Sequence, residues 1–164
     1  MRRSLAVAVI LSLAVTAILR NAQWHDDGTI WEDSIAQSPR KERGYNEIGL
    51  HLLDQGKPQE AYRFLNKSLE LNPYQPPIHV NLGIAYERLG QPEKARETYE
   101  RAIWYNPNDP NPYYNLGVLY YTTFKSPDKA LGYFLQARER NPLEPDVHQF
   151  LGQIYAERGD QAKA

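Results

Sequence analysis

Four prolines recur at a nearly constant spacing in this 164-residue chain and constrain its fold more than any other feature. Pro39, Pro73, Pro107 and Pro142 are separated by 34, 34 and 35 residues. Each segment that ends at one of the last three prolines repeats one pattern of small and apolar residues. The clearest copy holds Leu82-Gly83, Tyr86, Gly90, Ala95, Tyr99 and Ala102. A repeat of this length indicates stacked supersecondary units in place of one globular core.

The two neighbouring copies share this skeleton. The first carries Ile48-Gly49, Leu52, Gly56, Ala61, Leu65 and Ser68, and the third carries Leu116-Gly117, Tyr120, Ala130, Phe134 and Ala137. The order of small, aromatic and proline positions resembles the tetratricopeptide repeat (TPR), whose period is about 34 residues. The resemblance implies an all-α fold, a right-handed solenoid of antiparallel helix pairs. An apolar N-terminal run adds the expectation of one hydrophobic membrane or signal helix before it. The resemblance favours binding over catalysis.

Most of the repeated residues are predicted to serve packing and chain reversal. Apolar residues recur at three- and four-residue spacing, which predicts two helices in each copy. Glycine inside a helix costs about 1 kcal/mol relative to alanine, so we expect the mid-helix glycines to admit a close second helix. Glycines between the helices are expected in left-handed turns, and the Asn-Pro pairs are expected to end each second helix. The residues concerned are Gly83, Gly117 and Gly152 within helices, Gly56, Gly90 and Gly159 at turns, and the pairs 72–73, 106–107 and 141–142.

The period divides the chain into six segments. We expect an anchor or signal segment (1–20), a linker with a half-repeat helix (21–41), full repeats at 42–75, 76–109 and 110–144, and a truncated fourth repeat (145–164). The third repeat has one extra residue between its helices, where Ser126 and Pro127 are expected to begin the second helix. Trp31 aligns with Tyr99, so residues 29–38 are expected to form a second helix only.

The last repeat is expected to leave an apolar helix poorly covered. Phe150, Leu151, Ile154 and Tyr155 lie on its first helix, and only a short segment follows. A solenoid needs a polar terminal cap to stay soluble. Either the chain is a fragment of a longer array, or this end self-associates or is covered by a partner.

Composition argues against several functions. The net charge is −1, which gives no bulk attraction to nucleic acid. With no cysteine, a disulfide framework and a cysteine-based zinc site are excluded. His79 and His148 occupy equivalent repeat positions, which favours packing over metal binding. The sequence shows no phosphate loop, nucleophile motif or paired carboxylates, so we expect no cofactor, metal or catalytic residue and no enzyme.

The first twenty residues differ in kind from the rest. Arg2 and Arg3 precede an apolar run from Leu5 to Leu19, and Arg20 closes it. Fifteen residues extend about 22 Å as a helix, less than the roughly 30 Å of a bilayer core. The length suits a signal-peptide core, or a membrane helix whose arginines reach both interfaces. Either way, the arginines preceding the run predict repeats outside the cytoplasm.

A second resemblance favours a retained membrane helix. Trp24, the run Ile30–Asp33 and Ser38-Pro39 resemble the junction of multi-pass O-mannosyltransferase-like membrane proteins, in which a last membrane helix leads into extracytoplasmic TPRs. The rest of that architecture, including its catalytic loop, has no counterpart in the 164 residues. The resemblance therefore implies an anchor and no transferase activity.

The TPR resemblance also predicts where a ligand binds. In this family the first helices of successive repeats line a concave groove. From their place in the aligned repeats, the predicted groove residues are Asn46, Leu50, Leu53, Val80, Asn81, Ile84, Glu87, Tyr114, Asn115, Val118 and Tyr121. The cochaperone type that grips a terminal carboxylate has Lys or Arg at the positions of Asn46, Leu50, Tyr114 and Val118. None of these is basic, so that mode is not expected.

Two groove residues suggest a different mode. Asn81 and Asn115 occupy one repeat position and resemble the asparagine ladder of the O-GlcNAc transferase array, which holds an extended peptide backbone. A side-chain amide donates and accepts at once, so such binding tolerates many sequences. The alternative is that these asparagines bond between repeats.

These features predict a non-catalytic, membrane-anchored, extracytoplasmic scaffold that binds a protein or peptide in its groove. One alternative is a detached TPR tail of a glycosyltransferase-like multi-pass membrane protein. A self-assembling module is another.

Overall fold

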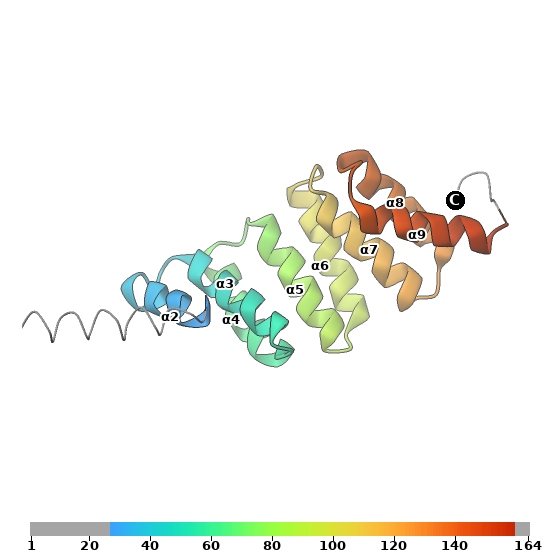
Figure 1. Cartoon of the computed structure of the whole chain (residues 1–164). Helices are drawn as coiled ribbons and strands as arrows, with labels where there is room; N and C mark the ends of the chain where they lie inside the picture. Colours follow the sequence, from blue (N-terminus) through green and yellow to red (C-terminus); the bar gives the residue numbers. More distant parts are fainter. Residues whose placement is uncertain (1–26, 160–164) are drawn as a thin grey trace, which may run out of the picture.

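The computed structural model describes residues 27–159 and consists there of eight α-helices without a strand (Figure 1). In chain order they are α2 (Asp27–Gln37), α3 (Glu42–Asp54), α4 (Pro58–Leu71), α5 (Pro76–Arg88), α6 (Pro92–Tyr105), α7 (Pro110–Thr122), α8 (Pro127–Arg140) and α9 (Pro145–Glu157). The all-α solenoid is confirmed. The expected membrane or signal helix at 1–20 lies outside the described residues.

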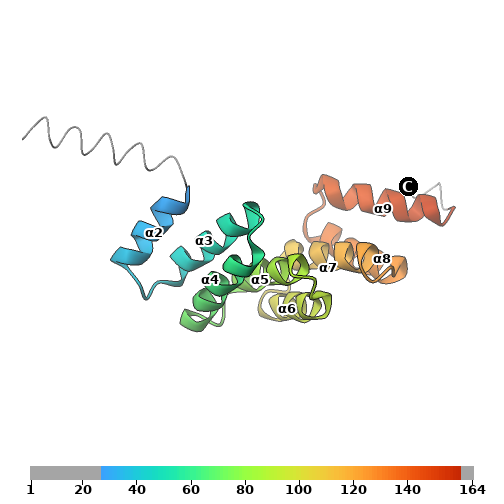
Figure 2. The same cartoon turned by 90° about the horizontal axis from the view of Figure 1, so that it is seen from below.

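Consecutive helices pack against each other along the array. The pairs α3/α4, α5/α6 and α7/α8 are the most extensive contacts, α2 packs on α3, and α9 packs on α8. Figure 2 shows that α3, α5, α7 and α9 follow the inside of a shallow arc, with α4, α6 and α8 outside. We call these two sets the inner and the outer helices. Within residues 27–159, no helix is long and apolar enough to cross a bilayer.

Proline and glycine set the helix boundaries. Each of the six helices from α4 to α9 has proline in its first turn. A backbone N–H at that place has no acceptor within the helix, so its absence in proline costs no hydrogen bond. Gly56 and Gly90 have φ of 71° and 69° at the turn after an inner helix, as expected of glycines that follow a helix C-terminus. Asn72, Asn106 and Asn141 are the C-caps of the outer helices, directly before a proline.

The mid-helix glycines bring the two helices of a pair into close contact. A Cβ added to Gly117 would lie 2.6 Å from the Phe134 ring, and one added to Gly83 would collide with the Tyr99 ring. Three clusters of buried residues run through the array, and the alanines that align with Ala95 are all fully buried. The packing role predicted for Gly83 and Gly117 is confirmed. For Gly152 no such contact is seen among residues 27–159, none of which lies within 4 Å of its added Cβ.

The turn in the third pair is longer than the other two. Residues 123–126 join α7 to α8, whereas residues 55–57 and 89–91 join the earlier pairs. Lys125 takes the left-handed conformation there, with φ of 50°. Ser126 stands at the N-cap of α8, but its side chain makes no capping hydrogen bond. Ser126 therefore occupies the expected N-cap position without bonding to the backbone of the helix.

Candidate functional site

The inner helices place nine of the eleven predicted groove residues on an accessible surface. Leu50 is 36% exposed, and the others are half-buried. We call this set the inner surface; it comprises Asn46, Leu50, Asn81, Ile84, Glu87, Tyr114, Asn115, Val118 and Tyr121. Half-buried side chains on neighbouring helices are suited to contact a ligand that runs across several repeats.

Leu53 and Val80 are buried and do not belong to the inner surface. Leu53 is 1% exposed and packs in one cluster with Leu82 and Ala85 of α5. Val80 is 8% exposed and packs in a cluster that includes Ala95. Side chains with so little accessible surface offer little to a ligand, so the candidate site leaves these two predicted groove residues out. An apolar side chain at the edge of the inner surface gains more from packing into the neighbouring repeat than from facing solvent.

An aromatic group forms one end of the inner surface. Phe150 of α9 stacks on Phe134 with ring centroids 4.8 Å apart, and it meets Tyr121 edge to face at 5.8 Å. Tyr114 lies 6.2 Å from Phe150, also edge to face. From the sequence, Phe150 is expected only as part of the poorly covered apolar helix of the last repeat. The structure adds it to the candidate site.

Two polar contacts join neighbouring inner helices across this surface. The Asn81 amide donates to Asn46 Oδ1 at 3.0 Å, from α5 to α3. The Tyr121 hydroxyl donates to the Glu157 carboxylate, from α7 to α9. The interpretation that Asn81 bonds between repeats therefore holds. Asn115 makes no side-chain hydrogen bond with another described residue, so its amide remains open to a ligand.

Glu87 is the half-buried carboxylate of the middle repeat. It accepts a hydrogen bond from the hydroxyl of Tyr99, and Arg88 lies close enough to interact with its charge. Burial raises the pKa of Glu87, and the Tyr99 hydrogen bond and Arg88 oppose part of that rise. Burial likewise raises the pKa of Tyr99, so its hydroxyl stays a donor at neutral pH.

A hollow opens beside the aromatic group, at the long turn of the third pair. It measures about 350 Å³ and is lined by Tyr121, Thr122, Lys125, Pro127 and Glu157. The lining offers a ring, a cation and a carboxylate, which suits one side chain of a bound polypeptide.

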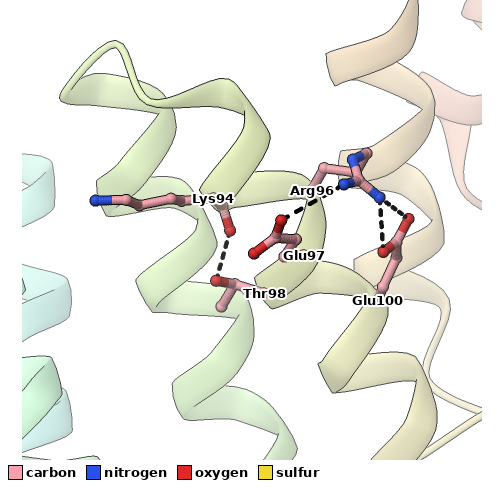
Figure 3. A network of polar contacts seen from close by, with 5 residues as sticks. All are labelled: Lys94, Arg96, Glu97, Thr98 and Glu100. Atoms are coloured by element: carbon pink, nitrogen blue, oxygen red, sulfur yellow. Dashed lines mark hydrogen bonds and ion pairs between the residues drawn. The ribbon is translucent and has the colours of Figure 1, made fainter.

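The outer helices present a different, charged surface. In Figure 3, Arg96 of α6 makes two hydrogen bonds to Glu100, at 2.7 and 2.9 Å, and lies 3.6 Å from Glu97. Thr98 donates to the carbonyl of Lys94 on the same helix. Exposed pairs of this kind contribute little to stability. They mark a solvated face and provide control positions away from the inner surface.

An exposed aromatic group was not anticipated. Trp104 is 76% exposed at the end of α6, and Tyr74 is 74% exposed on the loop before α5. Both rings contact Tyr105, which in turn lies 4.9 Å from the buried His79. His79 is packed as expected, but its repeat equivalent His148 is exposed. Among the described residues, no three His, Cys, Asp or Glu side chains are grouped to hold a metal.

Helix pairs of this length, with small residues at the crossing and proline at the start of each helix from α4 to α9, define an α-solenoid. The sequence profile of the tetratricopeptide repeat family matches residues 52–118 and, separately, residues 124–164. The two stretches together cover more than half of the chain. The chain belongs to the tetratricopeptide repeat family.

One curated relative and two solved structures illustrate the similarity. Protein O-mannosyl-transferase Tmtc2 of Drosophila melanogaster is 30% identical over 73 residues, which are 44% of this chain and 8% of that protein. MamA superimposes with a TM-score of 0.73 at 21% identity, over 88% of this chain and 85% of MamA. The first TPR of Spaghetti (RPAP3), solved with the HSP90 peptide SRMEEVD, superimposes with a TM-score of 0.68 at 23% identity, over 73% of this chain and 96% of that domain. The two structures share the fold.

Proposed function

We propose that this protein is a non-catalytic scaffold that binds a polypeptide segment along its inner surface. The observation that carries the proposal is the aromatic group of Tyr114, Tyr121 and Phe150 beside an open amide at Asn115. Aromatic side chains that remain partly accessible on a rigid element are typical anchors of binding energy. Extended or helical peptides with bulky residues are the ligands that such a surface accommodates.

The ligand is expected to differ from a carboxylate-terminated peptide. The RPAP3 domain with the same fold holds the HSP90 peptide SRMEEVD. The cochaperone type has Lys or Arg at four groove positions, which in this chain are occupied by Asn46, Leu50, Tyr114 and Val118. The charged residue of the inner surface is instead the acidic Glu87, and a second carboxylate, Glu157, accepts a hydrogen bond from Tyr121 at the other end of that surface. Acidic peptide ends are thus poor candidates, and apolar peptides are good ones.

A displayed library of random peptides, selected on the full chain, provides the probe for this proposal. We expect the selected peptides to lose about tenfold or more in affinity with Tyr121→Ala, about 1.4 kcal/mol. Tyr121→Phe keeps the ring and should lose much less. Arg101→Ala, on the exposed side of α6, is the control and should bind as the wild type does. If Arg101→Ala weakens binding as much as Tyr121→Ala, the ligand binds the outer helices.

Residues 1–20 are proposed to anchor these repeats on the extracytoplasmic face of a membrane. Support comes from the two arginines ahead of the apolar run, and from the O-mannosyltransferase relative that matches 44% of the chain. That same match supports an alternative role as the TPR part of a glycosyltransferase-like membrane protein. Cleavage of residues 1–20 as a signal would instead release the repeats. Finding the N-terminal peptide in the membrane fraction by mass spectrometry would distinguish anchoring from cleavage.

A further inference from the structure

Charged side chains are distributed unequally between the two sides of the arc. The inner helices carry six carboxylates and two Lys or Arg side chains, whereas the outer helices carry seven carboxylates and eight Lys or Arg side chains. Both inner cations are engaged within the chain. Arg88 donates to the carbonyl of Leu53, and the Arg43 guanidinium carbon lies 5.7 Å from the centre of the Trp31 ring. The inner helices therefore have an excess of negative charge, and the outer helices are almost neutral.

One face of α9 connects part of this negative charge to the aromatic group of the candidate site. At about 100° per residue, Asp146, Phe150 and Glu157 lie within about 40° of one another around the helix axis. Phe150 lies between the two carboxylates along the helix. Positions 146 and 157 are separated by about 16 Å of helical rise. This face of α9 thus presents an aromatic ring with one carboxylate on either side.

The two tyrosines of α7 extend this arrangement onto the inner surface. Tyr114 lies 6.2 Å from Phe150, and Tyr121 lies 5.8 Å from it. The Tyr121 hydroxyl donates to Oε1 of Glu157. Burial raises the pKa of the Tyr114 hydroxyl, and the negative charge of the nearby Asp146 adds to the rise. Each tyrosine therefore lies beside one of the two carboxylates, and the aromatic group has a carboxylate at each end.

Both carboxylates retain the capacity to bind a ligand. Asp146 and Glu157 are exposed, and neither forms an ion pair with another described residue. The bond from Tyr121 uses one oxygen of Glu157, and a carboxylate has about four acceptor positions. Arg158, the residue after Glu157, is paired with Asp128. Neither carboxylate is therefore neutralised within the part of the chain that the structure describes.

We propose that the polypeptide bound by the inner surface carries two basic side chains on either side of a bulky apolar residue. The apolar residue packs on the aromatic group, and one basic side chain lies at each carboxylate. This inference rests on the function proposed above and adds the class of ligand. About 16 Å corresponds to about five residues of extended chain. The open amide of Asn115 suits an extended backbone, because it can donate and accept at once.

Charge complementarity favours a basic segment over an acidic or a neutral one. Ammonium and guanidinium groups form charge-assisted hydrogen bonds with carboxylates and are attracted to the faces of aromatic rings. An acidic segment would meet like charge at both Asp146 and Glu157, and a neutral one would leave both carboxylates without an opposite charge. Exposed ion pairs each contribute little. The rings are thus expected to provide most of the affinity, and the carboxylates to select basic segments among apolar ones.

Peptides selected from the displayed library on the full chain provide the probes. We expect Lys or Arg at two positions about four to six residues apart, with a bulky apolar residue between them. A second version of one selected peptide, with both basic residues replaced by glutamine, serves as the neutral ligand. The double variant Asp146→Asn, Glu157→Gln removes both charges, and its amide at 157 still accepts from Tyr121. It should bind the selected peptide about fivefold more weakly and the neutral peptide as the wild type does.

The matched control removes two carboxylates from an outer helix. Glu93→Gln with Glu97→Gln, both on the exposed side of α6, should bind the selected peptide as the wild type does. Thermal midpoints show that both double variants keep the fold. Selected peptides that need Tyr121 but lack the basic pair, or an equal loss for the two double variants, would overturn this inference and leave the scaffold proposal standing. Peptides that bind Tyr121→Ala as well as the wild type would overturn the proposed function itself.

Discussion

The hydroxyl of Tyr99, a residue with no exposed surface, donates a hydrogen bond to the carboxylate of Glu87 on the inner surface. Tyr99 belongs to an outer helix and lies over Gly83, so its side chain passes across the helix pair before its hydroxyl meets Glu87. One side chain therefore fills the core of the middle repeat and fixes a charged group of the candidate site. A change at Tyr99 is therefore expected to affect both the stability of the fold and the position of a carboxylate in the candidate site.

Stability should fall with rising pH through the titration of Glu87. Burial raises its pKa in the folded chain above the ordinary 4.5, so the folded state keeps a proton that the unfolded chain has lost. The Glu87 contribution to stability is therefore greatest below the ordinary pKa of 4.5 that the unfolded chain has, and it is lost as pH rises through the folded pKa. Urea midpoints measured from about pH 4 to about pH 8 should show this slope.

Two variants separate Glu87 from the other titrating groups. Glu87→Gln should flatten the slope, since the amide does not ionise. Tyr99→Phe should steepen it, because the lost hydrogen bond had favoured the charged carboxylate. Identical pH profiles for the wild type and Glu87→Gln would show that Glu87 titrates as an exposed carboxyl group does.

Replacing Gly83 by leucine should destabilise the fold. An added Cβ there meets the ring of the buried Tyr99, and Ala95 is equally enclosed, with no exposed surface. We expect Gly83→Leu and Ala95→Leu each to cost about 1–3 kcal/mol or more through overpacking. Glu93→Ala, on the exposed side of α6, should change little. Equal thermal midpoints for the three variants would contradict the close-approach interpretation.

Binding to the inner surface should depend only weakly on salt. Its residues are mostly aromatic, aliphatic and amide side chains, and its one carboxylate, Glu87, accepts a hydrogen bond from the Tyr99 hydroxyl. Screening lengths fall from about 10 Å at 0.1 M to about 3 Å at 1 M salt, which weakens exposed charge pairs. We expect the dissociation constant of a selected peptide to change less than about threefold across this range. Loss of binding at moderate salt would indicate a charged outer surface.

Protease added outside intact cells or spheroplasts should digest the repeats if residues 1–20 are a membrane helix with the expected orientation. Arg2 and Arg3 then remain on the cytoplasmic side, because positive charges flanking a membrane helix set its direction. Immunoblotting for the repeats, with a cytoplasmic protein as control, gives the readout. Complete protection until the membrane is lysed would reverse the orientation.

The helical array could be predicted from the sequence because its signals are local. A proline at the start of a helix, a glycine after an inner helix and an Asn-Pro pair act within a few residues, and these features recur along the array. The environment of an individual position depends on the neighbouring repeat and was harder to predict. Gly83 and Gly152 share one motif, yet within the part of the chain that the structure describes only Gly83 meets an aromatic ring of the next helix.

The candidate site could be predicted only in part, because its residues also depend on contacts with neighbouring repeats. Leu53, Glu87 and Tyr121 occupy one repeat position, but Leu53 packs inward while the other two stay accessible. Side-chain polarity decides this outcome once α5 is in place beside α3. Phe150 was missed because its contacts cross from α9 to α7 and α8, which helical phase alone does not predict. The available signal was an apolar residue at the repeat position that Asn81 and Asn115 occupy in the two preceding repeats.

The hydrogen bonds between neighbouring inner helices lie on the concave side of the arc, where opening the solenoid lengthens distances most. Asn81 with Asn46 and Tyr121 with Glu157 therefore resist straightening. A ligand that spans two inner helices would bear the same tension, so its affinity and the end-to-end length of the array are thermodynamically linked. Stretching the protein should lower its affinity for that ligand, and the bound ligand should make the protein more resistant to extension.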